Sequence, residues 1–303
     1  MAGIMQNNMK VCGIENWKVE HRGTICCYLR QGEADNPVVH LLHGNGFSAL
    51  SLLALADALP ANWTLLATDI PGHGGSALDN QDNPDWTRLA DQVAVSLQAR
   101  TRGPVIGIGH SMGGVLSLRM ASRYPELFCQ LVLLDPVLFP PALLGAQRML
   151  RLTGLAGRLP LPRRARSRRY RWPALRDAET YLRARSLYAR WHERALRGFL
   201  ATGLRQTPAG VELACAPQWE AAIFASHPGD LWGDVKRLVV PTDIVVASEG
   251  FGFITPGAAR AMRLNSRINI HAFNGSHCFP MESPAETAGL LLSCIDKQGI
   301  TGR

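Results

Sequence analysis

The 303-residue sequence predicts an α/β fold with a mostly parallel central sheet, helices on both faces and an inserted helical cap. From residue 37, short apolar runs alternate with longer amphipathic runs; this alternation stops between residues 140 and 235 and then resumes. Runs that are apolar on both faces are typical of parallel strands covered by helices on both sides. The interruption contains no convincing strand, so it predicts an all-helical insertion over the strand ends, where α/β sheets bind ligands.

Apolar strands and amphipathic helices can be assigned in order before the insertion. Ser48 and Pro60 mark the two ends of the first helix, because serine caps helix N-termini and proline stops helices. The strands are expected over residues 37–42, 63–68, 104–109 and 131–134, and the helices over 48–59, 86–99 and 112–123.

The insertion and the segment after it are assigned in the same way. A proline- and arginine-rich connector is expected over residues 159–173, followed by helices near 178–198 and 218–226. The alternation resumes with a strand over 238–247, a helix near 256–264, a strand over 268–273 and a last helix over 283–296. We therefore divide the chain into a core of residues 1–139 and 236–303 and a helical cap or lid of residues 140–235.

Composition excludes several classes of protein. The chain is 47% hydrophobic and 18% charged, which indicates a folded protein rather than a disordered one. No apolar run approaches the length of a membrane span, and residues 1–20 lack the order of a signal peptide. The seven cysteines form no C-x-x-C pair and no zinc spacing. We therefore expect a cytoplasmic protein with free thiols, no cofactor and no metal.

Positive charge is concentrated in one part of the chain. Between Arg148 and Arg205 there are sixteen arginines and three acidic residues, while the whole chain has a net charge of +8. Such a block is explained by a solvated helical surface, or it attracts an anionic partner. No nucleic-acid-binding signature accompanies it, so we expect no nucleic acid partner.

A G-x-S-x-G motif at residues 109–113 lies between an expected strand and an expected helix. A sharp turn at this place holds Ser111 in a strained backbone conformation, and the glycines two residues away prevent clashes. The turn exposes the serine hydroxyl at the end of the sheet and places the Met112 amide at a helix N-terminus. Ser111 is therefore our candidate nucleophile.

A serine nucleophile requires a base, and His277 has the position of one. It lies in a loop after the last strand and before the last helix. His40 falls inside a strand and is expected in the core. His110, next to the serine, is expected to pack in the turn, with a hydrogen bond that supports the site as an alternative.

Four motifs together resemble the α/β-hydrolase superfamily: the residues are 43–46 (HGNG), 69–74 (DIPGHG), 109–114 (GHSMGG) and 275–277 (GSH). The resemblance implies the α/β-hydrolase fold, with its cap in the position of the insertion. It also implies an oxyanion hole formed by the Met112 N–H and an N–H of the 43–46 turn, for which we favour Asn45. We expect Asp69 and His73 to order the neighbouring loop rather than to react.

The acid of the catalytic triad is less clear from the sequence. Many members of the superfamily carry an aspartate where this chain has Gly250. Two candidates remain: Glu249, one residue earlier, and Asp135, directly after the preceding strand. Some relatives, including a subset of the haloalkane dehalogenases, place the acid at that earlier strand. We favour Asp135.

The resemblance implies a serine hydrolase that acts on carboxylic esters, thioesters or lactones through an acyl-enzyme on Ser111. A serine at this position excludes the branches that use an aspartate nucleophile. Apolar cap residues are expected to line an acyl pocket or to form the core of the cap: Phe139, Leu143, Leu144, Tyr188, Trp191 and Phe199. The alternative is a catalytically decayed binding module that acts through its basic cap. A further hypothesis is peripheral contact between the arginine-rich cap and an anionic membrane. The sequence does not predict an oligomeric state.

Overall fold

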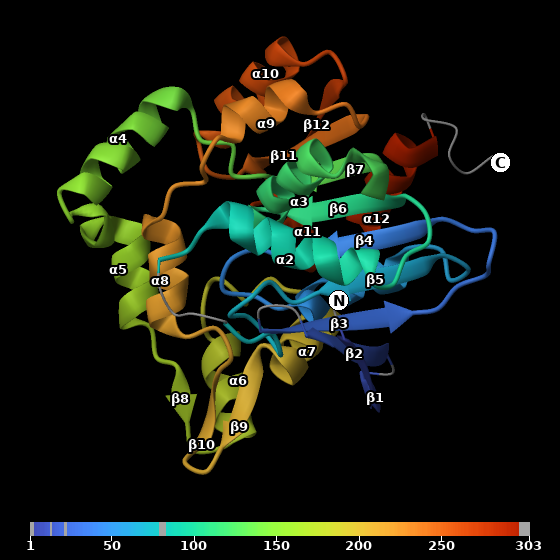
Figure 1. Cartoon of the computed structure of the whole chain (residues 1–303). Helices are drawn as coiled ribbons and strands as arrows, with labels where there is room; N and C mark the ends of the chain where they lie inside the picture. The colour runs from blue at the N-terminus through green and yellow to red at the C-terminus, as the bar shows by residue number, and fades with distance from the viewer. Residues whose placement is uncertain (1–2, 13, 21–22, 79–82, 297–303) are drawn as a thin grey trace.

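The computed structural model describes residues 3–12, 14–20, 23–78 and 83–296, and within them a nine-stranded sheet crosses the centre of the molecule (Figure 1). The strand order is β1-β2-β3-β5-β4-β6-β7-β11-β12. Neighbouring strands from β5 to β12 are parallel, whereas β1, β2 and β3 pair antiparallel at one side. The strands are β1 (Gly3–Val11), β2 (Ile14–Glu20), β3 (Thr24–Arg30), β4 (Val38–Leu42), β5 (Thr64–Thr68), β6 (Val105–His110), β7 (Phe128–Leu134), β11 (Thr242–Glu249) and β12 (Ile268–Ser276).

The helices cover both faces of this sheet and bury one apolar cluster on each side (Figure 1). On one face α3 packs against α2 and α9, and α9 against α10; on the other, α1 packs against α11 and α12. The α/β fold and the mostly parallel sheet are therefore confirmed. These helices are α1 (Leu53–Ala58), α2 (Trp86–Gln98), α3 (Met112–Arg123), α9 (Leu231–Arg237), α10 (Ile254–Leu264), α11 (Phe279–Glu282) and α12 (Pro284–Asp296).

The three antiparallel strands at the N-terminal side of the sheet were not assigned from the sequence. In β2 the buried residues Ile14, Trp17 and Val19 are separated by more exposed ones, as expected for a strand with one covered face. In β3 the run from Ile25 to Leu29 is buried throughout. Cysteines Cys26 and Cys27, which the sequence places in an apolar run, therefore lie inside the sheet.

The insertion is not all-helical, which corrects one expectation. A three-stranded sheet in the order β8-β10-β9 lies within it, and the connector expected over 159–173 contains a helix, α5. Pro160 and Pro162 lie in the first turn of α5, where a missing backbone N–H costs no helical hydrogen bond. The elements are α4 (Pro141–Leu152), α5 (Pro160–Ser167), β8 (Arg171–Trp172), α6 (Leu175–Arg183), α7 (Glu193–Thr202), β9 (Leu204–Thr207), β10 (Gly210–Leu213) and α8 (Pro217–Ala225).

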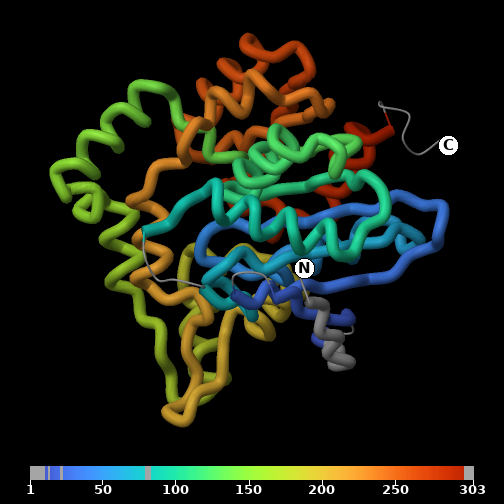
Figure 2. The backbone as a smooth tube through the Cα atoms, viewed as in Figure 1, coloured from blue at the N-terminus to red at the C-terminus, as the bar shows by residue number. Residues whose placement is uncertain are grey.

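The insertion contacts the core through α7 and α8. Helix α7 packs against α1 and against η1 (Ala49–Leu52), and α5 packs on α8. Figure 2 shows the chain passing from the sheet into the insertion and returning to it before β11. The expected boundary at residue 235 falls inside α9, which packs on α3 and α10 of the core. Among the described helices, none has the length and apolar character needed to cross a membrane.

Candidate active site

Ser111 occupies a sharp turn between β6 and α3. Its φ of 55° lies in the left-handed region, which non-glycine residues rarely adopt. The surrounding glycines allow this turn because a Cβ at Gly109 would lie 2.5 Å from the Gly113 carbonyl oxygen. A Cβ at Gly113 would lie 2.3 Å from the Leu42 oxygen at the end of β4. The motif therefore holds the serine against the ends of two parallel strands.

Three side chains from different strand ends form a continuous hydrogen-bonded chain. The Ser111 Oγ lies 2.9 Å from His277 Nε2, and His277 Nδ1 lies 2.6 Å from Asp135 Oδ2. Because a carboxylate only accepts hydrogen bonds, Nδ1 carries the proton and the Nε2 lone pair faces the serine hydroxyl. This is the tautomer that a general base requires.

Asp135 is buried at the C-terminal end of β7, with a positive φ of 44°. Its Oδ1 accepts a hydrogen bond of 3.0 Å from the Ala247 N–H, while Oδ2 faces the histidine. The other candidate, Glu249, is 61% exposed at its side chain and forms an ion pair of 3.3 Å with Arg190. The geometry thus brings Asp135, and not Glu249, to the imidazole.

Gly250, at the position where many relatives carry the acid, lies against the Asp135 carboxylate. A Cβ at this residue would be 2.7 Å from Asp135 Oδ2 and 3.2 Å from Oδ1. Any larger residue would compete for the space that the carboxylate occupies. The glycine and the aspartate on the earlier strand therefore fit together as a pair.

The turn at residues 43–46 lies directly beside the serine. A Cβ at Gly44 would be 3.2 Å from both the Ser111 Cβ and His110 Nδ1. Met112 is the first residue of α3, so its N–H has no acceptor within the helix. The Asn45 side chain binds the cap, since Nδ2 donates to the Glu220 carbonyl of α8 at 3.1 Å. Its backbone N–H is the second expected oxyanion donor.

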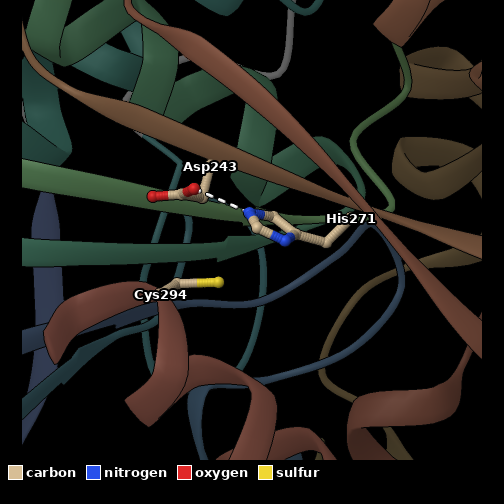
Figure 3. A group of neighbouring side chains, drawn as sticks. All are labelled: Asp243, His271 and Cys294. Carbon is tan, nitrogen blue, oxygen red and sulfur yellow. Dashed lines mark hydrogen bonds and ion pairs between the residues drawn. The ribbon is translucent and has the colours of Figure 1, made fainter. Parts of the chain in front are cut away.

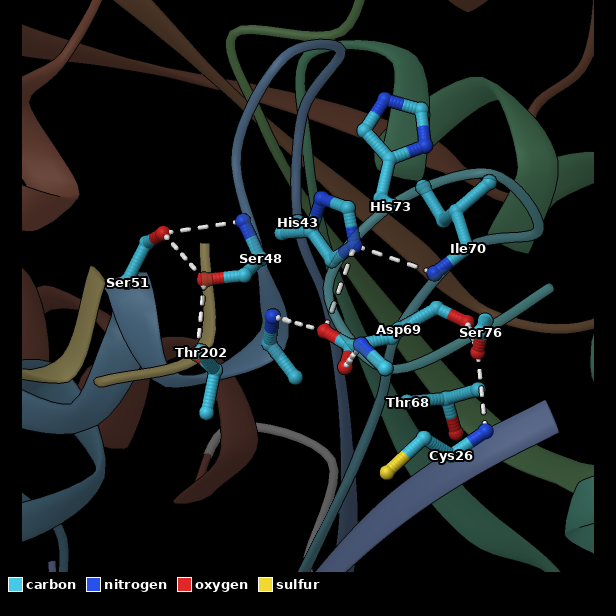
Figure 4. A network of polar contacts seen from close by, with 12 residues as sticks. Cys26, His43, Ser48, Ser51, Thr68, Asp69, Ile70, His73, Ser76 and Thr202 are labelled. Atoms are coloured by element: carbon cyan, nitrogen blue, oxygen red, sulfur yellow. Dashed lines mark hydrogen bonds and ion pairs between the residues drawn. The ribbon is translucent and has the colours of Figure 1, made fainter. Parts of the chain in front are cut away.

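A buried polar network fixes this turn and the loop after β5 (Figure 4). His73 Nε2 accepts from the Gly46 N–H at 3.0 Å, and His43 Nε2 accepts from the Ile70 N–H at 3.0 Å. The Asp69 carboxylate accepts from the backbone N–H groups of Ala49 (2.7 Å) and Gly75 (2.8 Å) and from a tyrosine hydroxyl. Asp69 and His73 thus order the loops, as expected, and lie outside the hydrogen-bonded chain of the serine.

Burial determines the protonation states in this network. It raises the pKa of Asp69 to about 6 and lowers the pKa of His73 to about 4. The pKa of His43 is also lowered well below its ordinary value, mainly by burial. Both histidines are therefore neutral near pH 7, and each can keep the lone pair that accepts a backbone N–H.

His110 supports the loop that carries His277. Its Nε2 lies 2.8 Å from the His277 carbonyl oxygen, so Nε2 carries a proton and donates it. Burial lowers the pKa of His110 to about 3, and the nearby His277 contributes in the same direction. His110 is therefore neutral. The sequence placed it in the turn but left this hydrogen bond open as an alternative.

The apolar residues expected around an acyl pocket divide into two groups. Tyr188, Trp191 and Phe199 are buried and pack on one another, and Phe47 connects Trp191 and Phe199 to His110. The other group lies where the insertion begins: Phe139 is half-buried, Leu144 is buried and Leu143 is exposed.

Sequence reasoning missed Phe251, whose ring centroid lies 4.7 Å from that of His277. It also missed Trp219 of α8, which donates from Nε1 to the Pro71 carbonyl at 3.2 Å. Phe251 directly follows Gly250, the position where many relatives carry the acid, and this neighbourhood could have indicated that Phe251 lies near the site. Nothing in the sequence indicated the Trp219 contact, because it joins segments far apart in the chain.

A separate group of potential metal ligands, also missed, lies between the sheet and α12: Asp243 of β11, His271 of β12 and Cys294 of α12 (Figure 3). His271 Nε2 lies 2.7 Å from Asp243 Oδ1, and the Gln130 amide donates to Asp243 Oδ2 at 3.0 Å. At zinc–ligand distances of about 2.0–2.1 Å, two tetrahedral ligand atoms stand about 3.3 Å apart. The 2.7 Å between His271 and Asp243 is shorter than this. As arranged, these side chains form a buried polar network that satisfies the aspartate.

The fold and this arrangement of residues define the class of protein. The family model described as "Alpha/beta hydrolase family" matches residues 41–290, and the chain belongs to that family. Family membership and esterase relatives support hydrolase activity.

Among particular relatives, the "Magnesium-chelatase 30 kDa subunit" of Rhodobacter capsulatus is 26% identical over 275 residues, covering 88% of this chain and 89% of that protein. The "Pimeloyl-[acyl-carrier protein] methyl ester esterase" of Neisseria meningitidis is 34% identical over 88 residues, which cover 29% of this chain and 32% of the relative. Among solved structures, the "Thioesterase Domain From Curacin Biosynthetic Pathway" has a TM-score of 0.72 at 21% identity and covers 92% of this chain and 99% of that one.

Proposed function

We propose that the protein is a serine hydrolase that cleaves carboxylic esters, including thioesters and lactones, through an acyl-enzyme on Ser111. The observation that carries the proposal is the continuous chain from Ser111 Oγ through His277 to the buried Asp135 carboxylate. The match to a methyl ester esterase supports an ester substrate, although it covers only 29% of this chain. The magnesium-chelatase subunit, whose match covers 88% of this chain, has a name that indicates no ester, so the site geometry carries the argument.

The proposed reaction follows from the positions of these atoms. The Ser111 oxygen attacks the carbonyl carbon while its proton moves to His277 Nε2. The Met112 and Asn45 N–H groups stabilise the negative oxygen of the tetrahedral intermediate, by about 3 kcal/mol for each donor. The leaving alkoxide or thiolate takes the proton from His277. Water then attacks the acyl-enzyme and gives a proton to His277. The bond between the acyl group and the Ser111 oxygen breaks, His277 returns the proton to that oxygen, and the free acid leaves.

Hydrolysis of p-nitrophenyl acetate and butyrate tests this proposal. We expect the wild type to turn over and Ser111→Ala to be inactive. Asp135→Asn should lower kcat by about 10⁴-fold, because asparagine favours the wrong imidazole tautomer. Glu249→Gln is the matched control, since this exposed side chain does not face the imidazole. Equal losses in the two carboxylate variants would contradict the assignment of the acid.

Fluorophosphonate labelling separates the enzyme from a catalytically decayed binding module. An activated Ser111 should label rapidly in the wild type and not at all in Ser111→Ala, with folding checked by circular dichroism. A wild type that neither hydrolyses the esters nor labels would favour the binding module. The intact hydrogen-bonded chain from Ser111 through His277 to Asp135 argues against decay.

A further inference from the structure

The first part of the insertion carries positive charge that no acid of the described residues neutralises through an ion pair. Residues 141–167, which we call the basic projection, contain six arginines and no acidic residue. All six arginines are exposed, and within the described chain none of them forms an ion pair. They are Arg148, Arg151, Arg158, Arg163, Arg164 and Arg166.

Of the ten later arginines of the same block, seven pair with acids. Arg168 pairs with Glu220 at 2.7 Å, and Arg171 and Arg205 share Glu212. Other pairs join α6 and α7 to neighbouring acids. Six of the nine arginines of the block that form no ion pair in the described chain therefore lie in the basic projection; the other three are Arg169, Arg176 and Arg185.

The basic projection also exposes large apolar side chains. Of the nine exposed large hydrophobic residues in the described chain, five lie within it, so the concentration is not a general property of the surface. Met149 is 62% exposed and Leu152 is 75% exposed. The others are Leu143, Leu155 and Leu161.

Two of these side chains, Met149 and Leu152, lie on the outward side of α4. Leu144 and Gln147 are the buried residues of this helix. At about 100° per residue, Met149 points about 170° and Leu152 about 110° away from the mean direction of these two buried side chains. Figure 1 shows α4 at the outer edge of the molecule, away from the central sheet. The helix therefore presents apolar side chains and arginines to its surroundings.

A row of aromatic rings connects the base of this helix to the candidate active site. Phe139 lies two residues before α4 and stacks on Phe253 at 4.9 Å between centroids. Phe253 stacks on Phe251 at 5.7 Å, and Phe251 contacts the His277 ring at 4.7 Å. All three phenylalanines are half-buried. They form an apolar path between the projection and the imidazole.

We propose that the basic projection docks on an anionic phospholipid surface, with Met149 and Leu152 entering the interface and the arginines binding lipid phosphates. Arginine mixed with long exposed apolar side chains is typical of interfacial helices. The projection has no aromatic residue, so it lacks the stacking platform that single-stranded nucleic acids use. Resting on the proposed function, the substrate class is an ester of a long acyl chain that enters from the membrane along the phenylalanine row.

Vesicle sedimentation tests the charge contribution. Wild type should bind phosphatidylcholine vesicles that contain phosphatidylserine, lose binding at high salt, and not bind pure phosphatidylcholine. Arg163→Gln combined with Arg164→Gln should lower the partition coefficient by about 30-fold. The matched control is Arg102→Gln with Arg267→Gln, two exposed arginines outside the projection, and should bind like wild type. Equal binding to neutral vesicles, or equal losses in both double variants, would overturn the proposal.

The apolar contribution is tested separately. Met149→Ser with Leu152→Ser should weaken binding to the anionic vesicles by at least about tenfold, because two buried side chains are lost from the interface. Met262→Ser with Val239→Ser changes two exposed apolar residues elsewhere, 46% and 53% exposed, and should have no effect. Unchanged binding of the first pair would refute insertion.

Activity measurements distinguish failure of this proposal from failure of the proposed function. Hydrolysis of p-nitrophenyl butyrate without vesicles reports on the site alone, and all four double variants should match wild type. Hydrolysis of p-nitrophenyl palmitate in anionic vesicles should fall in the two projection variants only. Binding without any hydrolysis would reject the esterase and retain docking; hydrolysis of both esters without binding would reject docking.

Discussion

Gly250→Ala tests whether the space beside Asp135 is a functional requirement. The added Cβ would lie 2.7 Å from Oδ2, so the carboxylate must move by roughly 0.5 Å to reach a permitted contact. The hydrogen bond of 2.6 Å to His277 Nδ1 would then lengthen or break. A hydrogen bond to a charged group contributes about 1.5–3 kcal/mol, which corresponds to a loss in kcat of about 10- to 150-fold.

Gly252→Ala is the control for this experiment. It makes the same change two residues later, where nothing lies within 4 Å of the added Cβ. Neither glycine has a positive φ, so both substitutions leave the backbone unstrained. The assay is kcat for p-nitrophenyl butyrate, with thermal unfolding as a check of folding. The reasoning is wrong if Gly250→Ala is as active as Gly252→Ala while Asp135→Asn is inactive. That result would mean that the close contact is relieved without moving the carboxylate of Asp135.

Three further predictions concern the buried groups. His73→Ala removes the acceptor of the Gly46 N–H, which loosens the oxyanion turn; kcat should fall about tenfold with little change in KM, measured by steady-state kinetics. Burial raises the pKa of Asp69 from 3.8 to about 6, so the folded state binds a proton on this carboxyl more strongly than the unfolded state does. The contribution of this carboxyl to the stability of the folded state is complete below pH 3.8 and is lost as the pH rises through 6. In urea unfolding, the free energy of unfolding of wild type should therefore fall by about 3 kcal/mol relative to that of Asp69→Asn over this range. Burial raises the pKa of both Cys26 and Cys27 to about 12, so these thiols should react with Ellman's reagent at pH 8 only after denaturation.

Local geometry explains why the serine turn could be predicted from the sequence. The positive φ of Ser111 requires small neighbours, and the chain supplies Gly109 and Gly113 within two residues on either side. The alternation of apolar and amphipathic runs likewise depends on adjacent residues, and the sheet from β4 to β12 was assigned on that basis. The short strands β8, β9 and β10 lack this signal because each spans four residues or fewer.

The partner of the histidine depends on how separate strands are aligned, which no local pattern encodes. Asp135 and Glu249 both occur near strand ends before His277, so their order in the chain could not separate them. The pairing of β11 with β7 and β12 places Val245 beside Leu134 and Glu249 beside Ser276. The positive φ of Asp135 then turns its carboxylate toward the imidazole, and this backbone conformation has no signature in the sequence.

The same distinction applies to the charge of the insertion. A count along the chain treats its sixteen arginines as one basic block. Folding separates them, because acids from outside the block, such as Asp57, Glu212 and Glu220, reach the later arginines. Glu220 lies on α8, the helix that also binds Asn45, so Arg168 pairs with an acid beside the candidate oxyanion turn. An arginine of this block therefore stabilises the fold where an acid lies within ion-pair distance. It remains open to a partner where no such acid lies nearby, and its position in the block does not decide between the two.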